Sequence, residues 1–118
     1  MKMSSILIGS ENPKALAEFY GKVFDAKPGF EDGGYIGYDT HGTFFMIGPH
    51  DKVKGKATNP ERMLIGFDAE DVKAEFERIK KTGATVIAEP YDAGDKMQIA
   101  TFADPDGNYF QIATPWKG

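Results

Sequence analysis

The sequence predicts an α+β fold in which two βαβββ modules form an open half-barrel with the helices outside. One order of strand-like and helix-like segments occurs twice, and a polar stretch divides the chain nearly in half. Leu7-Ile8-Gly9 recurs as Leu64-Ile65-Gly66, and Ala17-Glu18-Phe19 recurs at the same spacing as Ala74-Glu75-Phe76, which indicates an internal repeat. Each half alone is too small to bury both faces of a sheet. We therefore expect the two sheets to lie side by side around a cleft.

The composition fits one soluble domain, with 118 residues, 41% of them hydrophobic and 27% charged. We expect a single domain over 1–118, with module 1 at about 1–48, a linker at about 49–60 and module 2 at about 61–118. The net charge of −4 argues against a nucleic-acid partner. The absence of cysteine excludes disulfides and thiolate metal sites. No apolar run reaches the ~20 residues of a membrane span, so we expect a cytoplasmic protein without a membrane partner.

The first module begins with a short apolar run at 4–9, which predicts a buried strand. A helix follows, capped by Asn12 or Ser10, with Pro13 at a position where the missing N–H costs nothing. We expect Pro28-Gly29 to end it. Apolar residues recur at helical spacing and predict one buried helix face: Leu16, Phe19, Tyr20, Val23 and Phe24.

Two further strands complete the first module. Residues 31–34 indicate a turn, 35–39 alternate as a strand, His41-Gly42 forms a second turn, and 43–47 forms the last strand. Residues 48–60 are rich in lysine, glycine and proline, which is typical of a linker or mobile loop.

The second module repeats this order. A strand is predicted at 63–67, and Asp71 caps a helix that Gly83 ends as the C′ residue. Strands are predicted at 84–88 and 96–103. The buried face of the helix is expected to carry Val72, Phe76 and Ile79.

The chain closes with a hairpin whose turn is Asp-Pro-Asp-Gly at 104–107. Asp104 can cap the turn, Pro105 presets φ, and Gly107 supplies a left-handed residue. Alternate residues of the following strand then face opposite sides of the sheet. Phe110 and Ile112 form an apolar side, whereas Tyr109, Gln111 and Ala113 form a side that suits a ligand.

This hairpin resembles the last hairpin of the vicinal-oxygen-chelate superfamily, which includes glyoxalase I, extradiol dioxygenases, fosfomycin-modifying enzymes and bleomycin-resistance proteins. The segment 18–24 also resembles the family's helix-end pattern, in which Phe-Tyr is followed a few residues later by Gly, with Asp25 where that Gly usually stands. The resemblance covers the full length. It implies a homodimer, often with modules of two chains building each cleft.

The resemblance also implies four positions for the ligands of a divalent metal, usually His and Glu. These positions fall on Ser5, near Met46, on Leu64 or Arg62 depending on the register, and on Gln111. Such side chains do not form a ligand set for a hard or borderline cation. We therefore expect no metal site and no cofactor.

The leading hypothesis is a metal-independent small-molecule-binding protein of the glyoxalase/bleomycin-resistance type, which sequesters an apolar or aromatic compound in the cleft. Its basis is the loss of the four ligand positions together with aromatic-rich strands. The expected ligand-binding residues are Ser5, Leu7, Tyr38, Met46, Leu64, Phe102, Tyr109 and Gln111.

Two other hypotheses stay open at this point. The chain could be a glyoxalase-like lyase or related enzyme, either with an atypical or displaced metal site or with acid–base groups such as His41 and Glu61. His41 is the catalytic candidate because it borders two predicted cleft strands, and its other interpretation is an exposed turn residue. The third hypothesis is a regulatory domain whose cleft is packed shut. The sequence does not decide whether the protein is an enzyme.

Overall fold

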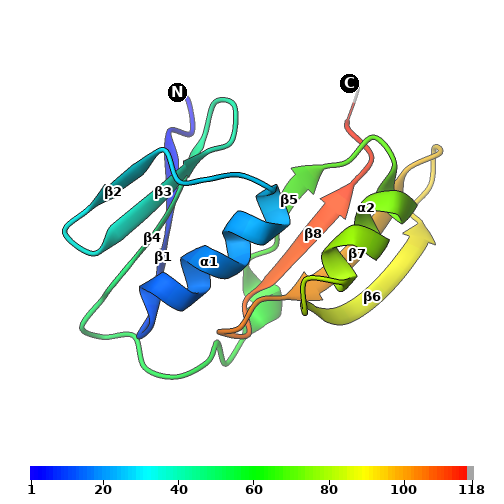
Figure 1. Cartoon of the computed structure of the whole chain (residues 1–118). Helices are drawn as coiled ribbons and strands as arrows, with labels where there is room; N and C mark the ends of the chain where they lie inside the picture. Colours follow the sequence, from blue (N-terminus) through cyan, green and yellow to red (C-terminus); the bar gives the residue numbers. More distant parts are fainter. Residues whose placement is uncertain (117–118) are drawn as a thin grey trace. The chain divides into compact units, whose positions relative to one another are not determined.

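The computed structural model describes residues 1–116, which contain two four-stranded sheets and two α-helices (Figure 1). The chain divides into two compact units, Met1–Gly55 and Lys56–Gly118. In both units the element order is strand, helix, then three strands, so the α+β class and the doubled βαβββ pattern are confirmed. The expected linker 49–60 is shared, since 49–55 belong to the first unit and 56–60 to the second.

The first unit has the sheet order β1-β4-β3-β2, with β1 parallel to β4 and the other pairs antiparallel. One helix covers one face of this sheet through Leu16 and Tyr20, both fully buried. The Tyr20 ring lies 4.8 Å from that of Phe45, between ring centroids. The elements are β1 (Ser5–Gly9), α1 (Pro13–Phe24), β2 (Phe30–Asp32), β3 (Tyr35–Asp39) and β4 (Phe44–Gly48).

The two ends of α1 are fixed by short-range hydrogen bonds. Asn12 is the N-cap, with its Oδ1 accepting from the Ala15 N–H at 3.4 Å. Ser10 instead accepts from the Asn12 N–H at 3.0 Å through its Oγ. The expected end at Pro28-Gly29 is wrong: α1 ends at Phe24, because Asp25 takes a left-handed conformation (φ 51°). The left-handed residue stops the helix before the chain reaches the proline.

The second unit repeats the sheet order as β5-β8-β7-β6, with β5 parallel to β8. Its core is a stack of three rings, in which Phe102 lies 5.3 Å from Phe76 and 5.5 Å from Phe110. The elements are a 3₁₀ turn (Pro60–Arg62), β5 (Ile65–Asp68), α2 (Val72–Lys80), β6 (Thr85–Asp92), β7 (Gln98–Ala103) and β8 (Tyr109–Ala113).

Several predicted boundaries of the second unit move. The strand expected at 84–88 runs from Thr85 to Asp92. The strand expected from Met63 begins at Ile65, and Met63 and Leu64 connect it to the 3₁₀ turn. The strand expected from Lys96 begins at Gln98, since Lys96 has a positive φ. Gly83 is left-handed (φ 95°), but it lies two residues beyond the C-cap Lys81 rather than at C′.

The predicted hairpin turn is confirmed. The Asp104 Oδ1 accepts from the Asp106 N–H at 2.9 Å and from the Asn108 N–H at 3.0 Å, and Gly107 is left-handed (φ 81°). The carboxylate thus holds the turn that sets the register of β7 against β8. Neither helix of residues 1–116 has the length and apolarity needed to cross a bilayer.

A buried hydrogen bond ties α1 to its sheet. The Tyr38 hydroxyl donates to the Ala17 carbonyl at 2.8 Å. Burial raises the pKa of the Tyr38 phenol, with smaller contributions from the charges of Glu31 and Glu18. The hydroxyl passes so close to Gly21 that a Cβ there would lie 2.7 Å from it. Gly21 therefore leaves room for the Tyr38 hydroxyl, although helix propensity alone would favour alanine at this position.

We predict that Gly21→Ala destabilises the protein by about 1–3 kcal/mol, the usual cost of overpacking. Helix propensity alone would give a gain of ~1 kcal/mol. In a Tyr38→Phe background the cost should fall by at least half, because the hydroxyl is gone and the ring Cζ would lie 3.6 Å from the new Cβ. Urea unfolding of the wild type, both single variants and the double variant measures this coupling. A Gly21→Ala variant more stable than the wild type would contradict the prediction.

A second prediction concerns the end of α1. Asp25→Gly should stabilise the protein by about 0.5–1 kcal/mol, because glycine adopts the left-handed conformation without steric cost and loses only part of that gain to its more flexible unfolded state. Asp25→Ala is the matched control and should destabilise it. Thermal unfolding of the three proteins gives the order Gly, Asp, Ala if the backbone conformation decides, and any order with alanine above glycine would disprove it.

Candidate functional site

The face of the second sheet that points away from α2 brings together three neighbouring strands. In the register, Gln111 of β8 lies between Gly66 of β5 and Thr101 of β7. Tyr109 is on the same face of β8, two residues before Gln111, and Leu64 precedes β5 with 48% of its surface exposed. We call this group, Leu64, Gly66, Thr101, Tyr109 and Gln111, the β8 face.

One hydrogen bond orients the polar group at the centre of the β8 face. The Gln111 Nε2 donates to the Thr101 Oγ1 at 3.2 Å. Thr101 is 6% exposed, so its hydroxyl is a fixed partner, whereas Gln111 is half-buried. With the nitrogen engaged, the Gln111 Oε1 has no donor among residues 1–116. The arrangement presents a hydrogen-bond acceptor on a surface that also carries the apolar side chain of Leu64 and the ring of Tyr109.

The first sheet has a corresponding face that points away from α1, and it is apolar. Leu7 of β1 lies beside Met46 of β4, and Leu7 is 54% exposed. The Phe44 ring lies over Gly37, where an added Cβ would be only 2.1 Å from a ring carbon. Ser5 is exposed at the start of β1 and supplies a hydroxyl at the edge of this face. We call these residues the β4 face.

Two of the expected ligand-binding residues do not lie on either face. Tyr38 is buried under α1, where its hydroxyl binds the Ala17 carbonyl. Phe102 is fully buried under α2, between Phe76 and Phe110. The expected placement of both was wrong, because alternation along β3 and β7 directs these rings toward the helices. The other expected residues, Ser5, Leu7, Met46, Leu64, Tyr109 and Gln111, are on the two faces.

The expected acid–base groups have the geometry of ordinary surface residues. His41 is exposed in the turn between β3 and β4, with φ 62°, and its backbone N–H donates to the Asp39 Oδ1 at 2.9 Å. Glu61 is exposed in the 3₁₀ turn before β5. His41 therefore serves the β3–β4 turn through its backbone, and its prediction as a catalytic residue stays untested.

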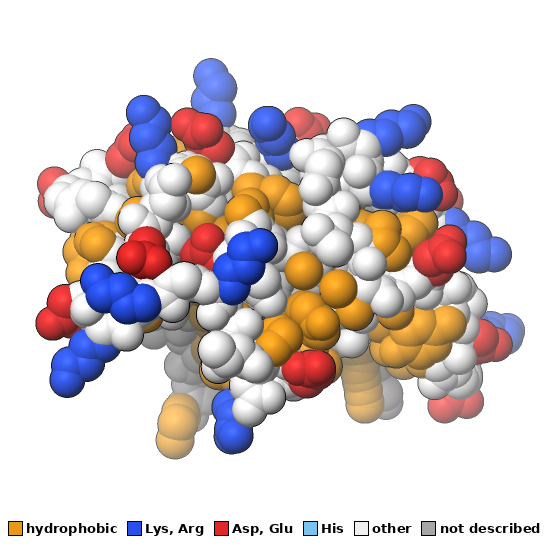
Figure 2. Space-filling view, turned by 90° about the horizontal axis from the view of Figure 1, so that it is seen from below, with side chains coloured by type: hydrophobic (Ala, Val, Ile, Leu, Met, Phe, Trp, Pro, Cys, Tyr) orange, Lys and Arg blue, Asp and Glu red, His pale blue; other side chains and the backbone are white. Residues whose placement is uncertain are grey.

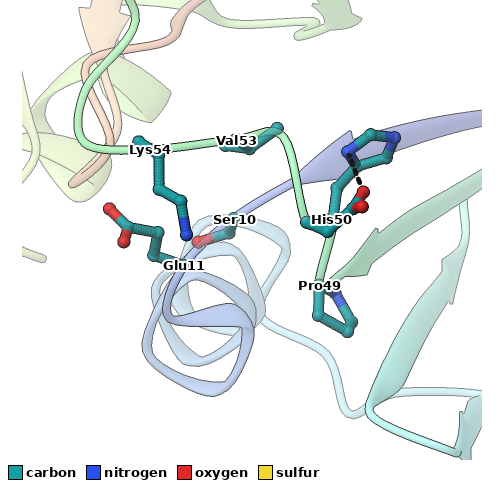
Figure 3. A pocket seen from close by; sticks show the side chains of 7 residues that line it. Ser10, Glu11, Pro49, His50, Val53 and Lys54 are labelled. Atoms are coloured by element: carbon teal, nitrogen blue, oxygen red, sulfur yellow. Dashed lines mark ion pairs between the residues drawn. The ribbon is translucent and has the colours of Figure 1, made fainter.

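An open pocket of about 440 Å³ lies at the start of α1, under the loop that follows β4 (Figure 3). The loop is held to the helix start, since the Gly55 N–H donates to the Glu11 carboxylate. In the same loop the Lys52 N–H donates to the His50 Nδ1 at 3.1 Å, and Asp51 lies 3.5 Å from that atom. These polar groups bind one another, and we assign the pocket to the anchoring of the loop.

Charged side chains of both signs are interspersed over the face shown in Figure 2, with hydrophobic side chains between them. A nucleic-acid interface would require a patch of basic residues. The mixed surface and the net charge of −4 provide no such patch on that face.

The residues at the four expected metal positions do not fit a divalent cation. They offer a hydroxyl from Ser5, a thioether from Met46, an alkyl group from Leu64 and an amide from Gln111, and the alternative third position, Arg62, is cationic. Mg²⁺, Mn²⁺ and Fe²⁺ prefer carboxylate or imidazole ligands, and Zn²⁺ adds thiolate. Among residues 1–116, no three His, Cys, Asp or Glu side chains gather where they could hold a metal ion.

Sequence reasoning missed two residues of the β8 face, Gly66 and Thr101. Thr101 could have been found, because the turn at 104–107 fixes the hairpin register and places position 101 opposite 111. In the sequence, Gly66 stands out only as part of the repeated tripeptide Leu-Ile-Gly. Its position beside Gln111 depends on the parallel pairing of β5 with β8, whose register is not set by any turn.

The fold and the two faces define a class of protein: paired βαβββ modules, each with one sheet face covered by a helix and the other face not covered by one. A sequence profile of the Glyoxalase/Bleomycin resistance protein/Dioxygenase superfamily matches residues 2–112. The chain belongs to this superfamily.

Solved structures agree with this assignment. A glyoxalase/bleomycin resistance protein/dioxygenase family enzyme from Burkholderia phytofirmans PsJN is 22% identical with a TM-score of 0.80, over 97% of this chain and 98% of that one. A glyoxalase-related enzyme from Fulvimarina pelagi is 21% identical with a TM-score of 0.80, over 98% and 88%. TioX from Micromonospora sp. ML1 is 14% identical with a TM-score of 0.77, over 97% and 98%. At these identities the likeness shows the fold alone. No curated protein matches the chain.

Proposed function

We propose that this protein is a metal-independent binding protein for small apolar or aromatic compounds, which it sequesters as a homodimer. The observation that carries the proposal is the chemistry of the four expected metal positions, where Ser5, Met46, Leu64 (or Arg62) and Gln111 are poor ligands for a divalent cation. The superfamily often uses this region for a small molecule, and here the region keeps exposed apolar side chains without a ligand set for a metal.

The sizes of the forces involved suit an uncharged ligand. An aromatic ring system buries about 150–250 Å², which at ~25 cal/mol per Å² contributes roughly 4–6 kcal/mol before the cost of association. Leu7 and Leu64, each about half exposed, provide apolar contact area of this kind. A single acceptor at Gln111 then adds orientation rather than much affinity. Fragment-sized compounds are therefore expected to bind weakly and larger aromatic compounds more tightly.

Metal independence gives the first test of the proposal. Protein treated with EDTA and then given Ni²⁺, Zn²⁺, Mn²⁺ or Fe²⁺ should keep its midpoint of thermal unfolding within about 1 °C, because a ligand that binds the folded state would raise it. A metal-dependent rise accompanied by turnover of a hemithioacetal or a catechol would overturn the proposal. Replacing Gln111 by Glu provides a comparison, since it adds one carboxylate at a family ligand position.

Binding itself is tested with indole and 2-naphthol as probes, by ¹H–¹⁵N correlation spectra in the presence of EDTA. We expect saturable shifts at the β8 face, and Leu64→Ser should weaken binding at least threefold because it removes exposed apolar contact area. Ile87→Ser is the matched control, since Ile87 is 42% exposed on β6 at the opposite edge of the same sheet. Absence of saturable shifts with both probes, or equal losses in the two variants, would refute the proposal.

A further inference from the structure

Gly66 occupies a strand position where the chain gives no reason for a glycine. Glycine in a strand interior weakens the strand, because it loses more backbone entropy and packs no side chain. The φ of Gly66 lies outside the left-handed region that favours glycine. A Cβ built on Gly66 would meet no atom of its surroundings within 4 Å. The residue is exposed, so the space above it is open.

The other strand glycines of residues 1–116 show what a structural reason looks like. A Cβ at Gly37 or Gly48 would lie 2.1 Å from an aromatic ring carbon of a neighbouring strand. A Cβ at Gly9 would lie 2.9 Å from the Val53 side chain. Each of these glycines makes room for a side chain of the protein itself. Gly66 makes room for nothing in residues 1–116, which suggests that something outside the chain approaches its backbone.

The neighbours of Gly66 indicate what that ligand must present. Gln111 lies directly beside it in the register of β5 and β8. Thr101 engages the Gln111 Nε2 at 3.2 Å, so the amide oxygen is the atom left for a ligand. Leu64, two residues before Gly66, is about half exposed and offers an apolar contact. The group therefore combines a flat backbone surface, one hydrogen-bond acceptor and an apolar side chain.

We infer that Gly66 keeps a gap open on the β8 face for the flat ring of an aromatic ligand that carries an N–H or O–H donor. The ring lies over the Gly66 backbone and its donor binds the Gln111 Oε1. Thr101 is a positioning residue, because its hydroxyl accepts from the Gln111 Nε2 and so leaves the Oε1 as the end of the amide that faces the ligand. This inference rests on the proposed binding function and specifies the chemical class of the ligand.

The first test compares indole with benzofuran, which has nearly the same shape but an acceptor oxygen in place of the N–H. Wild-type protein should bind indole about 3- to 10-fold more tightly, the effect of one hydrogen bond. Gly66→Val should weaken indole binding at least tenfold, while its midpoint of thermal unfolding stays equal to the wild type or rises, since the new side chain meets no neighbour. Gly37→Ala, the matched glycine variant, should lower the midpoint because the Phe44 ring is in the way.

The second test uses Thr101→Val, which removes the partner of the Gln111 Nε2. The amide can then turn either end to the ligand, so the preference for indole over benzofuran should fall toward one, with smaller changes in indole affinity. A merely structural role of Thr101 would weaken both probes equally and leave the preference intact.

The outcomes separate this inference from the proposed function. If wild-type protein binds neither aromatic probe, both fail. If both probes bind but Gly66→Val binds indole as the wild type does, or no donor preference exists, only the inference on Gly66 fails. If Gly66→Val unfolds at a lower temperature or changes the oligomeric state in sedimentation, the gap is filled by protein, and the inference is overturned.

Discussion

Each sheet of this protein has a single helix to cover it, and the rest of the structure depends on that constraint. A four-stranded sheet has two faces, and α1 or α2 can bury the apolar side chains of only one. Side chains such as Phe45 and Phe110 are buried on the helix-covered faces. The opposite faces still alternate in register with them, so they carry side chains that no helix covers. Those faces are where a βαβββ unit can acquire a function without disturbing its core.

Next to the helix-covered faces, two residues occupy positions that their own conformational preferences do not favour. Gly21 gives up helix propensity so that the Tyr38 hydroxyl can reach the Ala17 carbonyl. Asp25 adopts a left-handed conformation, which ends α1 at Phe24 and lets the chain turn toward β2. Such unfavourable local free energies are tolerated because the tertiary contacts that they permit stabilise the fold by more. Gly66 differs from these two residues. Its glycine is unfavourable for a strand, yet it permits no contact with another side chain of residues 1–116.

Much of the fold was predictable because its signals are local. Asn12 and Asp71 mark the helix starts, the turn at 104–107 fixes the last hairpin, and the alternation along β8 assigns its two faces. The misplacements of Tyr38 and Phe102 have a common cause. Nothing in a short alternating strand says which face meets the helix when both faces are apolar, so aromatic content alone could not assign them. The parallel pairing of β5 with β8 could not be predicted either. The register that places Gly66 beside Gln111 depends on a connection through a whole module.

The separation of the two faces also explains how side chains on the open faces can change without loss of the fold. Met46 and Gln111 lie on the faces away from the helices, and their backbone hydrogen bonds are made by the sheets whatever side chain they carry. A substitution at either position leaves Phe45 and Phe110, the neighbours in sequence, in the core. Thr101 accepts a hydrogen bond from the amide nitrogen of Gln111, so this polar group is satisfied within the sheet itself. The open face of the second sheet therefore offers its shape and a small number of polar atoms to its surroundings, and the Gln111 oxygen is one of those atoms.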